Sequence, residues 1–267
     1  MIAKLMVDLE NYSINISKSD NNDSLNIQIN DKIYNININI FNFFVSSILN
    51  ANNEIKYLKN NITEYKGKIC QVEYKEHKIL IEKADKVNIH FDKENFEVSL
   101  EEISILTEKI YGFYEEIYNF NFSLRDIDPM YLSNFLWKRI NYIVKSKIEN
   151  VMIDDLFVMH QGKKTKIINA AYYKALVEKQ DIYIPTVFHT NHINVSNYER
   201  VLDVFNIVKK YNYPFNNEYI IVYNEKFEIR DGQHRASALR YLYGNIKIPI
   251  MRMYFDEEKF NKFYEKK

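Results

Sequence analysis

Alternating apolar and polar residues mark the first part of the chain. Residues 25–30 and 33–40 alternate with a period of two, and Asn30-Asp31 between them predicts a turn. This period is typical of half-buried strands. Runs of the same kind predict further strands at residues 69–74, 77–83 and 86–91. We therefore expect residues 1 to about 122 to form a small mixed α+β domain.

Two helices are predicted within this N-terminal domain. Ser99 and Glu102 have the spacing of a capping box, and the helix that follows extends to about Tyr118. A shorter helix is expected to begin in the apolar run 41–49. The domain contains no recognisable chemical motif, so its strands could bind a partner or a substrate.

Residues 123–180 are predicted to form a helical connector. Asp128 before Pro129 matches an N-cap followed by proline at the first helical position. Apolar residues then recur at helical spacing, at Leu132, Phe135, Leu136, Ile143 and Val144. This spacing predicts one long helix to about residue 150. We expect residues 151–180 to be helical too, with a break at Gly162.

Residues 181–267 show the clearest pattern and predict a second α+β domain. The expected strands are at residues 182–188, 219–223, 227–229 and 246–255. The expected helices run from a capping box at Ser196-Asn-Tyr-Glu199 to about Tyr211, and from Gly232 to Gly244. The second and third strands form a hairpin around residues 224–226. Pro249 in the last strand indicates an edge position or a bulge, because proline has no N–H to donate.

Composition narrows the class of protein. Hydrophobic residues make up 46% of the 267 residues, enough for a sizeable core or for two domains. Lys plus Arg and Asp plus Glu number 36 each, and this formal net charge of zero argues against non-specific nucleic-acid binding as the main task. The single cysteine, Cys70, excludes an intramolecular disulfide. An early charged N-terminus and short apolar runs predict no signal peptide and no membrane span, as expected for a cytoplasmic protein.

The segment Asp231-Gly-Gln-His-Arg235 lies at a predicted junction between a strand and a helix. The first N–H groups of a helix lack internal partners and carry partial positive charge, so a phosphate is a natural ligand there. Gly232 would let a ligand approach the backbone, while His234 and Arg235 add a titratable donor and a fixed cation. The alternative is a tight turn in which Arg235 is solvated or paired with a carboxylate.

The order of predicted elements over residues 181–255, with the Asp-Gly-Gln-His-Arg segment after the hairpin, resembles the ParB/sulfiredoxin superfamily. In that family a Gly-x-x-Arg turn leads from a β-hairpin into a helix and a short strand. The resemblance implies a ParB/sulfiredoxin-like α+β domain over residues 181–267 that binds ATP or CTP with Mg²⁺. It also implies that Gly232, Gln233 and His234 cradle the phosphates, and that Arg235 neutralises charge on the transferred group.

Differences from family members narrow the expected activity. Sulfiredoxins have a cysteine just before their His-Arg pair, where this chain has Gln233, so sulfinic acid reduction is not expected. Chromosome-partition ParB proteins continue into helical DNA-binding modules, whereas residues 256–267 provide one short helix at most. What remains is a kinase or an NTPase that acts on an unidentified acceptor substrate.

A general base for such an enzyme has several candidates. The free-serine kinases of the superfamily have a carboxylate in the loop after the first strand, but the matching loop here has none before Glu199. His189 or His192 in that loop could act instead, because imidazole titrates near neutrality. Asp231 beside the phosphate-binding turn is the other candidate.

Three further possibilities are left open. His189 and His192 could bind a metal together with His160 or Asp154, although their spacing is common by chance. Arg240 is expected to cap the sheet edge or to pair with Glu228, unless it contacts a second phosphate. The alternative function is a nucleic-acid-associated nuclease or DNA-modification regulator. A basic surface would favour it, formed by Lys163, Lys164, Lys166, Lys209 and Lys210.

Overall fold

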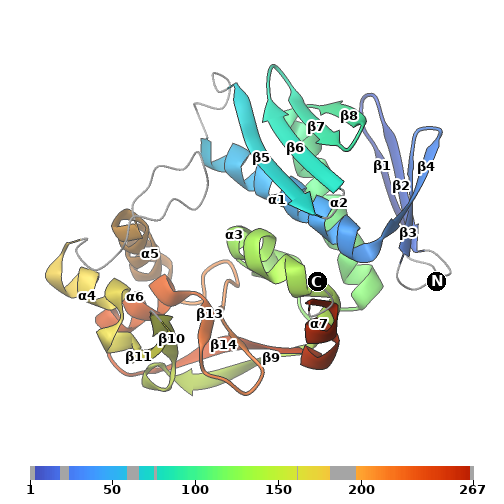
Figure 1. Ribbon diagram of the computed structural model, residues 1–267. Helices are drawn as coiled ribbons and strands as arrows, with labels where there is room; N and C mark the ends of the chain where they lie inside the picture. The colour runs from blue at the N-terminus through green and yellow to red at the C-terminus, as the bar shows by residue number, and fades with distance from the viewer. Residues whose placement is uncertain are drawn as a thin grey trace. The chain divides into compact units, whose positions relative to one another are not determined.

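The computed structural model describes residues 4–18, 24–58, 66–74, 77–160, 162–180 and 197–264 (Figure 1). The chain divides into two compact units. Of the described residues, the N-terminal unit takes 4–120 and 129–140, and the C-terminal unit takes 121–128, 141–180 and 197–264. Both units combine helices and strands, which confirms the α+β class.

The N-terminal unit contains two four-stranded antiparallel sheets (Figure 1). The first has the order β1-β2-β3-β4, with β1 Lys4–Asp8, β2 Ser13–Lys18, β3 Ser24–Ile29 and β4 Lys32–Asn37. The second has the order β5-β6-β7-β8, with β5 Gly67–Tyr74, β6 His77–Lys83, β7 Val87–Phe91 and β8 Glu94–Val98. The predicted strands and the turn at Asn30 are confirmed, except that residues 38–40, expected to continue a strand, are helical. Strands β1, β2 and β8 were not predicted.

Two long helices pack in this unit. Helix α1 (Ile38–Leu58) packs against β5 and β6, and it is longer than the short helix that the sequence predicts. Helix α2 (Leu100–Tyr118) begins with the predicted capping box. The Glu102 N–H donates to Ser99 Oγ at 3.1 Å, and the Ser99 N–H donates to the Glu102 carboxylate at 2.6 Å. These two bonds satisfy N–H groups that a helix end otherwise leaves unpaired.

A third helical segment of the N-terminal unit starts at Pro129, as predicted. It consists of α3 Pro129–Tyr131, the π-helix η3 Leu132–Leu136 and the 3₁₀-helix η4 Trp137–Tyr142. The Trp137 ring is fully buried, and its centroid lies 4.7 Å from that of Tyr114. Trp137 is therefore a core residue of this unit.

The C-terminal unit is built on a mixed four-stranded sheet in the order β13-β12-β14-β9. Its strands are β9 Ile143–Met152, β12 Ile220–Tyr223, β13 Ile229–Asp231 and β14 Lys247–Phe255. Strand β14 is parallel to β12 and antiparallel to β9, and β12 and β13 form the predicted hairpin. A separate antiparallel pair consists of β10 Phe157–His160 and β11 Lys163–Lys166.

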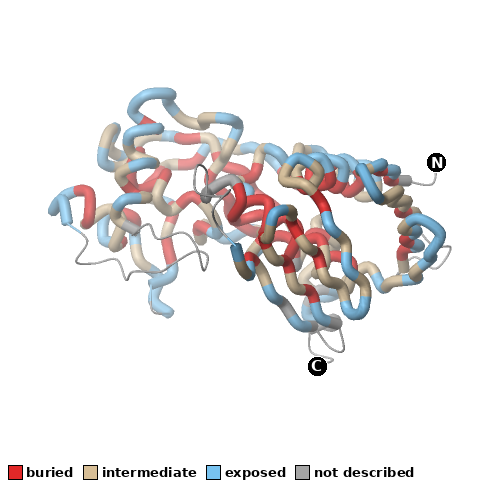
Figure 2. The backbone as a smooth tube through the Cα atoms, turned by 90° about the horizontal axis from the view of Figure 1, so that it is seen from above, coloured by how far each residue is buried: buried red, intermediate tan, exposed pale blue. Residues whose placement is uncertain are grey.

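Helices complete this unit and cover the sheet. The longer ones are α4 Ala171–Glu178, α5 Asn197–Tyr211, α6 Gln233–Tyr243 and α7 Glu257–Tyr264. Short 3₁₀ turns are η2 Leu124–Asp126, η5 Ile153–Asp155 and η6 Ile167–Asn169. Helix α6 packs against α4 and α5, and its buried face joins Ile220 and Ile250 in the core. Figure 2 shows the buried residues of the chain in red. The predicted helix from Gly232 to Gly244 and the strand after it are confirmed.

The expectation of a helical connector over residues 123–180 is wrong for residues 143–166, which form three strands. Residues 143–152 form β9, paired along its length with β14. Contacts across the two strands stabilise this pairing, because Arg252 pairs with Glu149 and the Lys145 ammonium lies 4.7 Å from the Tyr254 ring centre. Gly162, predicted to break a helix, instead lies between β10 and β11 with a φ of 75°.

Pro249 does not occupy an edge strand, which corrects the sequence-based expectation. Strand β14 lies inside the sheet between β12 and β9. The irregularity in its pairing with β9 occurs at Tyr254 and Phe255, not at the proline. The carbonyl of Pro249 accepts a hydrogen bond from the Tyr213 hydroxyl at 2.8 Å.

Two sequence predictions lie outside the described residues: the strand at 182–188 and the Ser196 position of the second capping box. Helix α5, which that box was expected to start, is present and ends at Tyr211 as predicted. None of the helices in the described ranges is both long and apolar enough to cross a membrane.

Candidate functional site

The Asp231–Arg235 segment joins β13 to α6, as the sequence predicts. Gly232 is the N-cap residue of α6, and its φ of 90° lies in the region that favours glycine. A Cβ atom at this position would lie 2.9 Å from the Ile220 side chain on β12. The turn therefore requires glycine for its conformation and for its close approach to the neighbouring strand.

The Arg235 side chain points back into the protein and is 6% exposed. Its Nη1 pairs with the Glu218 carboxylate at 2.9 Å. Its Nη2 pairs with the Asp231 carboxylate and donates to the Tyr219 carbonyl at 3.3 Å. Arg235 is thus held by carboxylates, which is the alternative that the sequence left open.

Two of the carboxylates around Arg235 have raised pKa values. Burial raises the pKa of Asp231 to about 6 and that of Glu218 to about 7, although Arg235 opposes both shifts. The Asp128 carboxylate adds to both increases through like-charge repulsion. One guanidinium is therefore shared among three acidic groups, and two of them titrate near neutral pH.

Gln233 and His234 form the first turn of α6 and are both partly buried. Gly232 provides no side chain to cap the N–H groups of this turn. The His234 ring meets the Tyr172 ring of α4 edge to face, with centroids 4.3 Å apart. The turn thus combines the first N–H groups of a helix with an imidazole that lies against a tyrosine.

The other predicted site residues are not brought to this turn by the described structure. His189 and His192 lie outside the described residues. His160 is exposed at the end of β10. The residues that sequence reasoning missed are Glu218 and Arg200, which have no local motif around them and are recognisable only from the fold.

The carboxylate of Asp154 has a structural role, because it binds Arg240. Both carboxylate oxygens of Asp154 accept from Arg240, at 2.7 Å and 3.2 Å. Arg240 therefore pairs with Asp154 and not with Glu228, which pairs with Arg230 instead. Within the described part of the chain, no group of three His, Cys, Asp or Glu side chains is placed to hold a metal ion.

The single cysteine is not suited to nucleophilic catalysis. Burial raises the pKa of Cys70 to about 11, so this thiol is a poor nucleophile.

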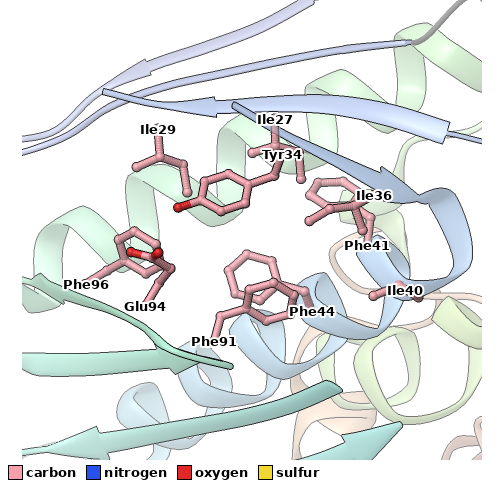
Figure 3. A pocket seen from close by; sticks show the side chains of 10 residues that line it. All are labelled: Ile27, Ile29, Tyr34, Ile36, Ile40, Phe41, Phe44, Phe91, Glu94 and Phe96. Carbon is pink, nitrogen blue, oxygen red and sulfur yellow. The ribbon is translucent and has the colours of Figure 1, made fainter. Parts of the chain in front are cut away.

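The N-terminal unit contains an apolar cavity between β3, β4, β8 and α1 (Figure 3). Its volume is about 30 Å³, and Phe41, Phe44 and Phe96 contribute to its lining. An adjoining apolar cavity of about 40 Å³ shares these three side chains. Each is far smaller than the roughly 150 Å³ that accommodates a benzene ring in a protein core. We attribute these spaces to the packing of large aromatic side chains.

No known protein family, curated protein or solved structure matches the chain. The likeness to the ParB/sulfiredoxin superfamily thus depends on the residues quoted above and stays a prediction. The class that the fold defines is an α+β protein of two units, with a partly buried group of carboxylates beside the start of a helix.

Proposed function

We propose that the chain is a ParB/sulfiredoxin-like enzyme that binds ATP or CTP, with Mg²⁺, and transfers or hydrolyses the terminal phosphate. The observation that carries this proposal is the junction of β13 and α6. There, a first helical turn without a side-chain cap lies directly after a buried carboxylate. Helix N–H groups can bind phosphate oxygens, and a carboxylate can accept a proton from the attacking hydroxyl or water.

The phosphate donors in this proposal are mainly backbone groups. The N–H groups of Gln233 and His234 belong to the first turn of α6, where the helix dipole favours an anion. The Gly232 N–H donates to the Asp231 carboxylate and so orients that group at the same turn. The His234 imidazole, held by Tyr172, would add a side-chain donor.

Asp231 is the base that this geometry favours over His189 or His192. With a pKa of about 6, its carboxylate is mainly ionised at pH 7 and can still accept a proton. Arg235 fixes Asp231 and Glu218 through ion pairs, so we assign Arg235 as a positioning residue and not as a direct phosphate ligand. Glu218, with a pKa of about 7, shares Arg235 with Asp231, so protonation of one carboxylate is coupled to protonation of the other.

When bound with the nucleotide, Mg²⁺ supplies positive charge to the phosphates. Since the described residues contain no ready-made metal site, phosphate oxygens and water would provide most of its ligands. A magnesium ion of this kind needs at most one or two protein carboxylates.

The test is isothermal titration of the protein with ATP, CTP and GTP in the presence of Mg²⁺, followed by a phosphate-release assay. Asp231→Asn should reduce turnover by about 100-fold or more, because it removes the base. Asp154→Asn is the matched control, since it neutralises a carboxylate of the same unit that binds Arg240. Failure of the wild-type protein to bind any nucleotide would contradict the proposal.

A nucleic-acid-associated role is the second candidate, and the β10–β11 hairpin favours it. Lys163, Lys164 and Lys166 are all exposed on this hairpin. The Lys164 ammonium lies 4.1 Å from the Phe157 ring centre, so a cation and an aromatic ring occur together. Retention of duplex DNA that weakens with salt, and that Lys163→Ala with Lys164→Ala abolishes, would support this role over the first.

A further inference from the structure

Three side chains come from the first turns of three helices that pack against one another, α4, α5 and α6. They are Tyr172 of α4, Arg200 of α5 and His234 of α6, which we call the Arg200 cluster. The Tyr172 and His234 rings are in edge-to-face contact, with an angle of 82° between them. Tyr172 packs in the same apolar cluster as Val201, the residue that follows Arg200. Burial raises the pKa of Tyr172, and the charge of Arg200 opposes this shift.

Each member of the Arg200 cluster belongs to the first turn of its helix. The three helices pack against one another, and Phe205 of α5 meets Tyr241 of α6 further along, with ring centres 5.8 Å apart. Helices α5 and α6 therefore run in the same direction, with their N-termini at the same end. The positive ends of the α5 and α6 dipoles are thus at the same end of this helix pair.

Arg200 supplies the positive charge of this group. Its Nη1 atom is shielded from solvent and has no hydrogen-bond partner among the described residues. No carboxylate in the described ranges forms an ion pair with it, although Glu199 precedes it in the chain and is exposed. A buried guanidinium donor without an acceptor is rare in folded proteins and points to a ligand that completes it.

The contrast with Arg235 decides which arginine can meet an anion. The guanidinium of Arg235 already has the carboxylates of Asp231 and Glu218 as partners. A phosphate near Arg235 would have to compete with two negative groups, whereas Arg200 offers its donors without such competition. Arginine is suited to this task because its planar fork can bind two phosphate oxygens at once.

We infer that the Arg200 cluster holds a phosphate group of the nucleotide, an inference that rests on the function proposed above. Arg200 supplies the charge and the paired donors, and the neutral Tyr172 hydroxyl supplies a further hydrogen bond. His234 belongs both to this cluster and to the first turn of α6, so it connects the two sets of phosphate donors. The ligand class is a nucleoside triphosphate, recognised by its polyphosphate chain.

The experiment compares dissociation constants for Mg²⁺-ATP, Mg²⁺-CTP and inorganic triphosphate in four proteins. Arg200→Gln should weaken binding of all three by about 10-fold or more, because a charge-assisted contact is lost. Tyr172→Phe, which keeps the ring against His234, should weaken binding by about threefold. Lys209→Gln, an equal loss of charge at an exposed position of α5, should leave binding unchanged.

The outcomes separate this inference from the proposed function. If the wild-type protein binds neither nucleotide, the proposed function fails and this inference fails with it. If the wild-type protein binds and both Arg200→Gln and Tyr172→Phe bind equally well, only the inference is overturned. An equal loss in Lys209→Gln would also overturn it, since the effect would then be one of overall charge. Tyr172→Phe keeps the test decisive if Arg200→Gln does not fold.

Discussion

Arg252 and Arg235 are two buried arginines of the C-terminal unit with opposite surroundings. Arg252 is 2% exposed and binds one carboxylate, that of Glu149 at 2.6 Å, together with the carbonyls of Asn224 and Lys226. Burial alone would raise the pKa of Glu149, but hydrogen bonds from Lys147 and Arg252 lower it overall. Arg235 instead forms ion pairs with two carboxylates, those of Asp231 and Glu218, whose pKa values are raised.

The difference shows that the ratio of carboxylates to cations, and not burial alone, sets the protonation state. Glu149 has two cations for one carboxylate and stays ionised. The group around Arg235 has an excess of acid, so part of it retains protons near neutral pH. The first arrangement fastens β9 and the β12–β13 turn to β14, whereas the second is suited to proton transfer.

The largest expected effect is that of Arg252→Ala. This change removes a buried cation, takes a donor from the Asn224 and Lys226 carbonyls and leaves Glu149 with Lys147 alone, so it should lower the free energy of unfolding by about 3–5 kcal/mol. Urea-induced unfolding followed by circular dichroism measures the loss. A loss below about 1 kcal/mol would show that Arg252 does not fasten β9 and the β12–β13 turn to β14.

Arg235→Ala should cost less, and its cost should depend on pH. At pH 5.5 Asp231 and Glu218 can take up protons when the guanidinium is removed, so we expect a loss of about 1–2 kcal/mol. At pH 8 the carboxylates are left charged and unpaired, and the loss should approach about 3 kcal/mol. Unfolding curves at both pH values test this, and equal losses would contradict the comparison.

The next effect, that of Glu218→Gln, is on the pH dependence of stability. The pKa of Glu218 is about 7 in the folded protein and 4.5 in the reference state, so the unfolded chain releases this proton first. Its contribution favours folding below pH 4.5 and is lost as the pH rises to 7. The variant should therefore lose less stability over this range, by at most about 1.4 kcal/mol per pH unit. Glu225→Gln, at an exposed turn position, should keep the wild-type slope.

The smallest effect concerns a third arginine, Arg240, whose pair with Asp154 is partly exposed, at 21% and 32% of the two side chains. Solvent screens such a pair, so Asp154→Asn should lower the free energy of unfolding by less than about 1 kcal/mol. Chemical unfolding of the variant provides the measurement. A loss as large as that of Arg252→Ala would mean that solvent exposure does not decide how much each ion pair stabilises the fold.

Local signals predicted part of this fold well. The capping box at Ser99, the hairpin before Asp231 and the helix between Gly232 and Gly244 depend on neighbouring residues, and each is present. Strand β9 was missed because Ile143 and Val144 continue a helical spacing, while the partner that makes it a strand lies about 100 residues further on. Its pairing with β14 outweighed local preference.

The candidate site was predictable to a similar degree. The turn at Gly232 follows from a short segment of sequence, and phosphate binding at this turn stays a prediction. The partners of Arg235 could not be predicted, since Glu218 lies 17 positions away and Asp128 more than 100. Arg200 has no motif of its own and becomes a candidate only when its surroundings are known.

The pairing of β9 with β14 has a consequence for synthesis of the protein. Met152 at one end of β9 is opposite Lys247, so the ribosome must add 95 residues (247 minus 152) before that pair can form. At ~5–20 residues per second, this interval lasts ~5–20 seconds. During that time β9, which exposes Val144 and Ile148 even in the finished fold, has no central strand to pair with. The nascent chain is then most open to strand pairing with other chains, and a chaperone that covers this segment would act in that interval.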